Sequence, residues 1–283
     1  MRLLFVPLLS LTAIAQTYHF EPAKIAQGQT LKVLGDKSTK DVRLADRTVP
    51  VFEQSTGDSL GLMPIGVLMK PGVYSLEWLD VQGKPIHTES LVVGNAHYAT
   101  QNVVLSKALT QLRSTPDERE TVAAFLKDGS PVRYWEEPLH APIPGCITSP
   151  FGVQRLHNGK PTGDFHAGLD QRGAMGSPIH AVTGGVVKIA QKFTLRGGTV
   201  AVDHGQGLES IYLHMSEIAV KEGQQVKEGD VIGHVDSTGR STGPHLHWTL
   251  YANGEPVSPL QWVSLATCPG EIRRKTHKRR ASR

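Results

Sequence analysis

Short apolar runs separated by glycine constrain the fold of this chain more than any other feature. The first group, between residues 17 and 95, comprises Thr30–Leu34, Val42–Leu44, Thr48–Phe52, Val73–Leu79 and Ile86–Val93. Runs of this length, bounded by turn residues and without helical periodicity, are typical of β-strands. We therefore expect residues 16–95 to form a small immunoglobulin-like β-sandwich. It has no cluster of titratable groups, so we assign it no chemistry.

A second group of strand-like runs lies between residues 145 and 265, so the fold class is mostly β. Its members are Gly185–Ala190, Thr199–His204, Ser210–Ser216, Val231–Val235 and Leu246–Tyr251. A chain of 283 residues is long enough for two ordinary domains.

Residues 96–144 separate the two groups, and their apolar residues follow a different pattern. Apolar residues recur at helical spacing between Val103 and Lys127. The segment Ser114–Asp117 interrupts them and looks like the cap of a second helix. The prolines from Pro138 to Pro144 then predict an extended lead into the next domain. We expect a short helical connector with a Pro-rich linker.

The first fifteen residues resemble a signal peptide. Arg2 precedes the apolar run Leu3–Leu11, and Ala13-Ile14-Ala15 has the small-x-small pattern of a cleavage site. The alternative is an uncleaved anchor, but the run is shorter than the about 20 residues that span a bilayer. We expect an exported protein, periplasmic or extracellular at the cell envelope, that begins at Gln16 after cleavage.

The two cysteines, Cys146 and Cys268, flank the second group of strands. In an exported protein they can pair, which would tie the two ends of that domain together. The alternative is two buried free thiols.

The net charge of +4 comes from the end of the chain. Seven Lys and Arg residues lie in the last eleven positions, and without them the rest has a charge of −3. We expect residues 266–283 to be a disordered basic tail, or one that contacts an anionic wall polymer or lipid. Nucleic acid is not an expected partner, because no aromatic platform accompanies the charge.

Candidate chemistry lies in a histidine-rich region. Eight of the thirteen histidines fall between His157 and His247. In the segment from Pro244 to Leu250, apolar and polar residues alternate strictly. Side chains two apart share one face of a strand, so Leu246, Trp248 and Leu250 should enter the core. His245 and His247 should then point together to the other side, an arrangement that suits a metal site or acid–base chemistry.

The same argument applied to Ile211–Met215 predicts that Ile211, Leu213 and Met215 are buried. Tyr212 and His214 should then lie on the opposite face. A strand that carries a single histidine more often uses it structurally, so a structural role is the alternative for His214.

The third candidate is Phe165–Asp170. On a straight strand His166 and Asp170 would be about 13 Å apart, too far to share a metal ion. A bend at Gly168 would bring both to one ion.

Two histidines and one carboxylate form a ligand set that leaves a coordination position open for water on zinc. We therefore expect one zinc ion held by His166, Asp170 and His247. No His-Glu-x-x-His motif supplies a glutamate base. His214 and His245 are the candidate catalytic residues, because imidazole titrates near neutral pH.

Seven motifs in this region closely resemble those of the lysostaphin-like peptidoglycan endopeptidases, over about residues 145 to 260. They are Ser149-Pro-Phe-Gly152, Phe165-His-x-Gly-x-Asp170, Gly176-x-Pro-Ile, Gly184-Gly-Val-Val, Val202-Asp-His-Gly205, Tyr212-x-His-Met215 and Ser237-Thr-Gly-x-Ser-Thr-Gly-Pro-His-Leu-His247.

The resemblance implies a β-sandwich of the duplicated hybrid motif type over residues 145–265, which cuts the peptide cross-links of bacterial peptidoglycan. It also implies zinc ligands at His166, Asp170 and His247, and catalytic residues at His214 and His245. Some relatives have lost their ligands and activate amidases, so the alternative is a non-catalytic wall-binding or amidase-activating module. The cross-link cut, D-alanyl-diaminopimelate or a glycine bridge, stays open. The position of the N-terminal domain also prompts the hypothesis that this domain shields the groove until it is removed.

Overall fold

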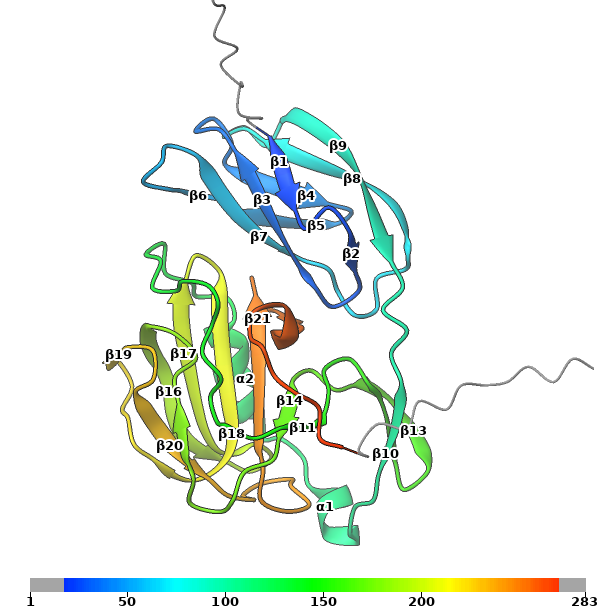
Figure 1. The fold of residues 1–283 in the computed structure, drawn as a ribbon, viewed down its shortest axis with the longest axis vertical. Coiled ribbons are helices and arrows are strands. Elements are labelled where there is room, and N and C mark those ends of the chain that lie inside the picture. The colour runs from blue at the N-terminus through cyan, green and yellow to red at the C-terminus, as the bar shows by residue number, and fades with distance from the viewer. Residues whose placement is uncertain (1–17, 270–283) are drawn as a thin grey trace, which may run out of the picture.

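A computed structural model describes residues 18–269, and Figure 1 shows two β-rich units stacked along the long axis. The expected signal peptide and most of the basic tail lie outside the described residues. Within them, no helix combines the length and the hydropathy needed to cross a membrane. The mostly β fold expected from the sequence is confirmed.

The N-terminal unit consists of two facing sheets. One has the strand order β1-β3-β7-β6 and the other β2-β9-β8-β4-β5. Its strands are β1 (His19–Glu21), β2 (Ile25–Ala26), β3 (Thr30–Gly35), β4 (Asp41–Leu44), β5 (Arg47–Pro50), β6 (Phe52–Glu53), β7 (Ser59–Pro64), β8 (Gly72–Leu79) and β9 (Pro85–Gly94). Inward side chains of both sheets form one core, with Leu31 and Met63 from the first sheet and Leu76, Trp78 and Leu91 from the second.

The segment expected as a helical connector contains two helices and a strand. Helix α1 spans Lys107–Gln111 and α2 spans Pro116–Phe125. Thr115 caps α2, since its hydroxyl accepts a hydrogen bond from the Glu118 N–H, as the Ser114–Asp117 pattern predicted. Strand β10 (Thr100–Val103) pairs in parallel with β12 (Gln154–His157). The connector thus supplies part of the second unit.

The second unit is built on a ten-stranded sheet, whose main path runs β11-β14-β21-β18-β17-β16-β19. Its strands are β11 (Ile147–Ser149), β14 (Leu169–Gln171), β15 (Pro178–His180), β16 (Gly185–Phe193), β17 (Gly197–Gly205), β18 (Leu208–Ile218), β19 (Gln225–Val226), β20 (Val231–Val235), β21 (Leu246–Ala252) and β22 (Glu255–Val257). A smaller sheet joins β10 to β12 (Gln154–His157) and β13 (Lys160–Phe165), and a short 3-10 helix spans Pro259–Gln261.

Cys146 and Cys268 form a disulfide, so the expected pairing is confirmed and the free-thiol alternative is wrong. The backbone beside it is paired as well. Ile147 donates its N–H to Ala266 and accepts from the Cys268 N–H. Ordered pairing therefore continues to residue 268, beyond the expected domain end at 265.

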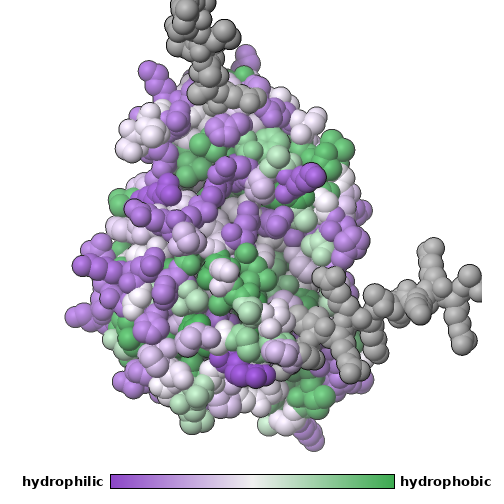
Figure 2. Space-filling model, in the orientation of Figure 1, coloured by the Kyte–Doolittle hydropathy of each residue, from purple (hydrophilic) through white to green (hydrophobic). Residues whose placement is uncertain are grey.

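Residues of the first unit extend the hydrophobic core of the second. Leu60, Leu62 and Val67 of the first unit pack in the same cluster as Trp135 and Trp262 of the second. Figure 2 shows polar residues over much of the upper unit and hydrophobic residues gathered nearer the middle of this face. Arg47 and Glu255 add an ion pair of 2.6 Å across the junction. The units are thus joined by buried apolar surface and not by the connector alone.

Candidate active site

A groove of about 750 Å³ lies on the outer face of the large sheet. One wall comes from β10, β12 and β13, and the other from the loop that leads into β21. Every residue that lines this groove belongs to the connector or the second unit, from Gln101 onward. The N-terminal sandwich therefore does not cover the groove, which removes the basis for a shielding role.

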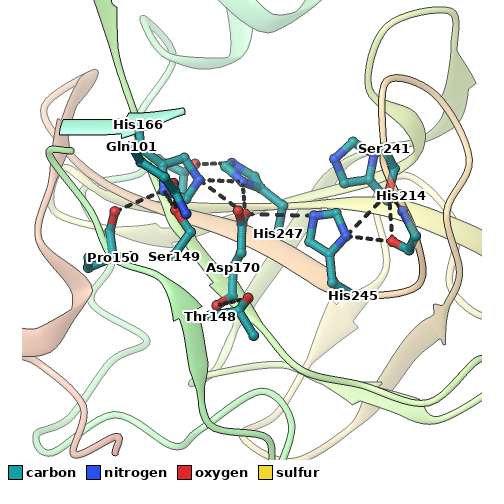
Figure 3. A network of polar contacts seen from close by, with 12 residues as sticks. Gln101, Thr148, Ser149, Pro150, His166, Asp170, His214, Ser241, His245 and His247 are labelled. Carbon is teal, nitrogen blue, oxygen red and sulfur yellow. Dashed lines mark hydrogen bonds and ion pairs between the residues drawn. The ribbon is translucent and has the colours of Figure 1, made fainter. Parts of the chain in front are cut away.

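Three of the expected site residues meet at the floor of this groove (Figure 3). Asp170 on β14 and His247 on β21 are register partners in neighbouring antiparallel strands. Asp170 Oδ1 lies 2.8 Å from His247 Nδ1 and 3.0 Å from His166 Nε2. The two imidazole nitrogens are 3.0 Å apart. The sequence placed these residues in one site, and the structure brings them together.

The expected bend occurs where β13 ends at Phe165 and β14 begins at Leu169. Gly168 lies in this bend and packs directly on β21. A Cβ atom at this position would be 2.6 Å from Thr249 Oγ1 and 2.9 Å from His247 Nε2, with the Trp248 carbonyl closer still. Only glycine therefore fits at position 168 without displacing β21.

Neighbouring groups fix how the two histidines present their nitrogens. His166 Nδ1 lies 2.9 Å from the Pro150 carbonyl, which can only accept, so Nδ1 carries the proton and Nε2 offers its lone pair to the groove. His247 Nε2 is 3.2 Å from Thr249 Oγ1, which can accept a hydrogen bond from the Nε2–H group when Nδ1 binds a metal. Arg155 lies 3.3 Å from the other oxygen of Asp170. The donor atoms are thus oriented in advance.

This donor set fits a zinc ion. Its two nitrogens and one carboxylate oxygen lie within 4.8 Å of one another. Zinc bonds of 2.0–2.1 Å in a tetrahedron place ligand atoms about 3.3 Å apart, close to the spacing here. Burial lowers the pKa of His247 to about 4, partly opposed by Asp170. Burial alone would raise the pKa of Asp170, but His166 and His247 hold it well below its usual value. Both groups are in the forms that bind metal.

His245 and His214 lie beside the three candidate ligands. His245 Nε2 is 3.7 Å from Asp170 Oδ1, and the centres of the His214 and His245 rings are 5.0 Å apart. The Nδ1 atoms donate to backbone carbonyls, His245 to Gly243 at 2.8 Å and His214 to Thr238 at 2.8 Å. Each ring therefore keeps Nε2 free of a proton, as a general base requires.

The expected faces were correct for β21 and wrong for β18. Leu246, Trp248 and Leu250 are fully buried in the main core, as the alternation predicted. In β18, however, Tyr212 lies in that core, on the opposite face from Ile211.

The reason is a β-bulge between Tyr212 and Met215. Tyr212 pairs with Val200 and Met215 with Gly198, so two residues of β18 oppose one of β17. His214 has a φ of 66° in this bulge. The extra residue places Leu213 and His214 together on the groove side. His214 thus reaches the site through an irregularity that strict alternation does not describe.

Several groups around the site were not predicted. Ser149 accepts from His166 at 3.1 Å and donates to Gln101 at 2.7 Å. Ser149 belongs to a motif quoted above, whereas Gln101 lies in the connector and has no signal in the sequence. Thr249 could have been found, because it is two residues beyond His247 on the same face. Arg155 gave no sign of its contact with Asp170.

One further histidine of this region, His204, is fully buried in β17. Its Nδ1 donates to the Gly184 carbonyl at 2.6 Å, and its Nε2 lies 2.7 Å from Ser210 Oγ. Burial lowers the pKa of His204 to about 4. It is part of the core between β17 and β18 and not of the groove.

Comparison with known proteins agrees with this geometry. A model described as peptidase family M23 matches residues 164–259, which contain all five expected site residues. The chain is 42% identical over 121 residues to the DD-carboxypeptidase/endopeptidase Mpg of Neisseria meningitidis serogroup B, which is 43% of this chain and 27% of that protein. It is 38% identical over 115 residues to the peptidoglycan DD-endopeptidase ShyA of Vibrio cholerae, 41% of this chain and 27% of that protein. The matches thus span about a quarter of the length of these curated relatives.

A solved structure is similar over nearly its whole length. It is described as a peptidase M23 from Pseudomonas aeruginosa, with 30% sequence identity and a TM-score of 0.63, and the alignment covers 84% of this chain and 94% of that chain. Together with the family model, this similarity shows that the protein belongs to the lysostaphin-like peptidase family M23.

Proposed function

We propose that this protein is an exported, zinc-dependent endopeptidase that hydrolyses the peptide cross-links of bacterial peptidoglycan. The observation that carries the proposal is the meeting of His166, Asp170 and His247 within hydrogen-bond distance, with two further imidazoles beside them in one groove. The name of the relative ShyA supports a peptidoglycan substrate, and the name of Mpg supports endopeptidase activity. We also propose the immunoglobulin-like and duplicated hybrid motif folds for the two units.

In this proposal His166 Nε2, Asp170 Oδ1 and His247 Nδ1 hold the metal. A bound zinc ion supplies a Lewis acid that polarises a carbonyl group and makes water more acidic. The protein groups around it do the orienting: the Pro150 carbonyl fixes the ring of His166, and Arg155 retains the second oxygen of Asp170.

His245 and His214 move the protons. Each has its Nδ1 proton donated to a backbone carbonyl, so each can accept a proton at Nε2 without a change of tautomer. One of them takes the proton of the attacking water at Nε2, and the imidazolium so formed returns that proton to the leaving amine. The other stabilises the oxyanion when it also carries a proton on Nε2. His214 is buried and the side chain of His245 is only 17% exposed, which limits competing water.

Two features support export to the cell envelope. The expected signal sequence precedes the described residues, and the Cys146–Cys268 disulfide suits an oxidising compartment. We propose periplasmic or extracellular action, with the basic tail as a contact for an anionic wall polymer or lipid.

The test is hydrolysis of purified sacculi by the full chain, with released muropeptides identified by mass spectrometry and bound metal measured separately. A chelator should abolish release and added zinc should restore it. His247→Ala should lose both zinc and hydrolysis. His245→Ala and His214→Ala should retain zinc and lose turnover, while His180→Ala, which lies outside the lining of the groove, serves as the control.

The alternative is a non-catalytic wall-binding or amidase-activating module. It predicts that the wild-type chain binds sacculi but releases no muropeptide with zinc present. That result would overturn the proposed enzyme.

A further inference from the structure

The groove is electropositive even before a metal binds. Four arginines line it, Arg155, Arg172, Arg196 and Arg240, against two aspartates, Asp164 and Asp170. The chain outside its last eleven residues carries a net charge of −3, so the groove has the opposite sign to the body around it. A cleft of one charge attracts substrates of the other.

Two of these arginines are already neutralised by the protein. Arg196 contacts the buried carboxylate of Glu118 at 2.7 Å, and Glu118 also accepts two backbone N–H groups from Leu195 and Arg196. Arg155 lies 3.3 Å from Asp170. The charge of Arg196 is therefore compensated by Glu118, and that of Arg155 by the candidate metal ligand Asp170.

Arg240 is different. Among residues 18–269 its guanidinium has no ion-pair partner, although it is partly buried in the groove. Burial lowers the pKa of Arg240, and so do the charges of Arg113 and Arg155, while the carboxylate of Asp164 partly opposes them. A partly desolvated charge among like charges is unfavourable unless an anion completes it. Guanidinium groups bind carboxylates through two parallel hydrogen bonds.

The loop holds Arg240 in place beside the catalytic candidates. Its backbone N–H donates to the Leu195 carbonyl at 2.8 Å. The next residue, Ser241, has its hydroxyl 3.2 Å from His245 Nδ1. An anion on Arg240 would thus be held in the same groove as His245.

We propose that Arg240 is a carboxylate-binding residue that selects anionic peptides, in which a free carboxylate lies next to the scissile amide. This inference rests on the proposed function and narrows its substrate class. A cross-link to diaminopimelate offers such a carboxylate, whereas a glycine bridge does not.

The test compares two cross-linked dimers that differ at one group. One is the D-alanyl-diaminopimelate dimer, and the other has the carboxylate beside the scissile amide converted to a carboxamide. The zinc-loaded wild-type chain should cleave the first with a kcat/KM about 10- to 100-fold higher. Arg240→Gln should lose this preference, mainly through KM, and retain zinc, and Arg240→Lys should recover part of it. Arg113→Gln, an exposed nearby arginine outside the lining, should change the preference less than about 2-fold.

A preference that survives in Arg240→Gln, or that is absent from the wild-type chain, overturns the role of Arg240 and leaves the proposed function standing. If the wild-type chain cleaves neither dimer, the proposed function fails. In that case binding of the two dimers, measured by calorimetry, still decides the role of Arg240: equal affinities for wild type and Arg240→Gln would exclude it.

Discussion

The α-carbon of Gly168 faces the ring of His247 so closely that a methyl group between them would lie 2.9 Å from His247 Nε2. The motif that supplies His166 and Asp170 is therefore shaped around the strand that supplies His247. The three residues are connected by packing as well as by their shared position in the groove.

We expect Gly168→Ala to push β14 away from β21. It should weaken zinc binding by at least about 10-fold and lower the free energy of unfolding by about 1–3 kcal/mol. Zinc affinity by chelator competition and unfolding in urea would measure both effects. Gly129→Ala is the control, because a Cβ there meets no atom within 4 Å. Unchanged zinc affinity in Gly168→Ala would show that β21 adjusts freely.

The buried imidazole of His204 predicts a loss of stability in acid. Its pKa is about 4 in the folded state and about 6.5 when unfolded, so the unfolded chain binds the proton more readily. Stability is full above about pH 6.5 and falls as the pH drops towards 4. Replacing His204 with Gln should reduce the slope of unfolding free energy against pH by up to about 1.4 kcal/mol per pH unit in that window.

The slope is the informative quantity here, because it does not depend on any constant loss of stability in the variant. Denaturant unfolding at several pH values between 4 and 7 would measure it. An identical slope in both proteins would mean that His204 is not the group that takes up the proton.

The disulfide closes a segment of 122 residues around the groove. The chain-entropy model assigns a loop of this length about 4–5 kcal/mol. The double variant Cys146→Ser, Cys268→Ser should therefore unfold at a much lower urea concentration than the oxidised wild-type chain. A reductant should lower the unfolding midpoint of the wild-type chain by the same amount and leave that of the double variant unchanged. A double variant as stable as the oxidised wild type would contradict this expectation.

Gln261 connects the two units through paired hydrogen bonds. Its amide oxygen accepts from the Thr30 N–H at 2.7 Å, and its amide nitrogen donates to the Thr30 carbonyl at 2.6 Å. Gln261→Ala should cost about 1–3 kcal/mol, since it leaves two backbone groups without partners. Gln82→Ala, at an exposed turn of the N-terminal unit, is the control. Urea unfolding followed by tryptophan fluorescence would compare them, and equal midpoints would argue against the pairing.

Much of the fold and site could be predicted because regular strands follow a period of two. The buried residues Leu246 and Trp248 identified the groove face of β21, and with it His247. The period fails where a strand is buried on both faces: all six residues of β7 are buried, so it shows no alternation. It fails again at the bulge beside His214, where one extra residue reverses the faces of β18.

Long-range contacts left no trace in the local pattern. Gln101 reaches Ser149 only because β10 of the connector pairs with β12, and parallel pairing between distant segments has no local periodicity. The sequence also could not distinguish Arg240 from other loop arginines. Its lack of an ion-pair partner among residues 18–269 is a property of the folded groove.

The core shared by the two units has a consequence for how this chain can be cut or recombined. The segment that matches the family ends at residue 259, but the apolar cluster beneath it continues into Leu60, Leu62 and Val67. A fragment chosen by similarity alone would expose side chains that the intact protein keeps from water, and it would tend to aggregate. The segment that matches the family is thus shorter than the segment that keeps its apolar side chains buried. A chimaera should be designed on the longer of the two.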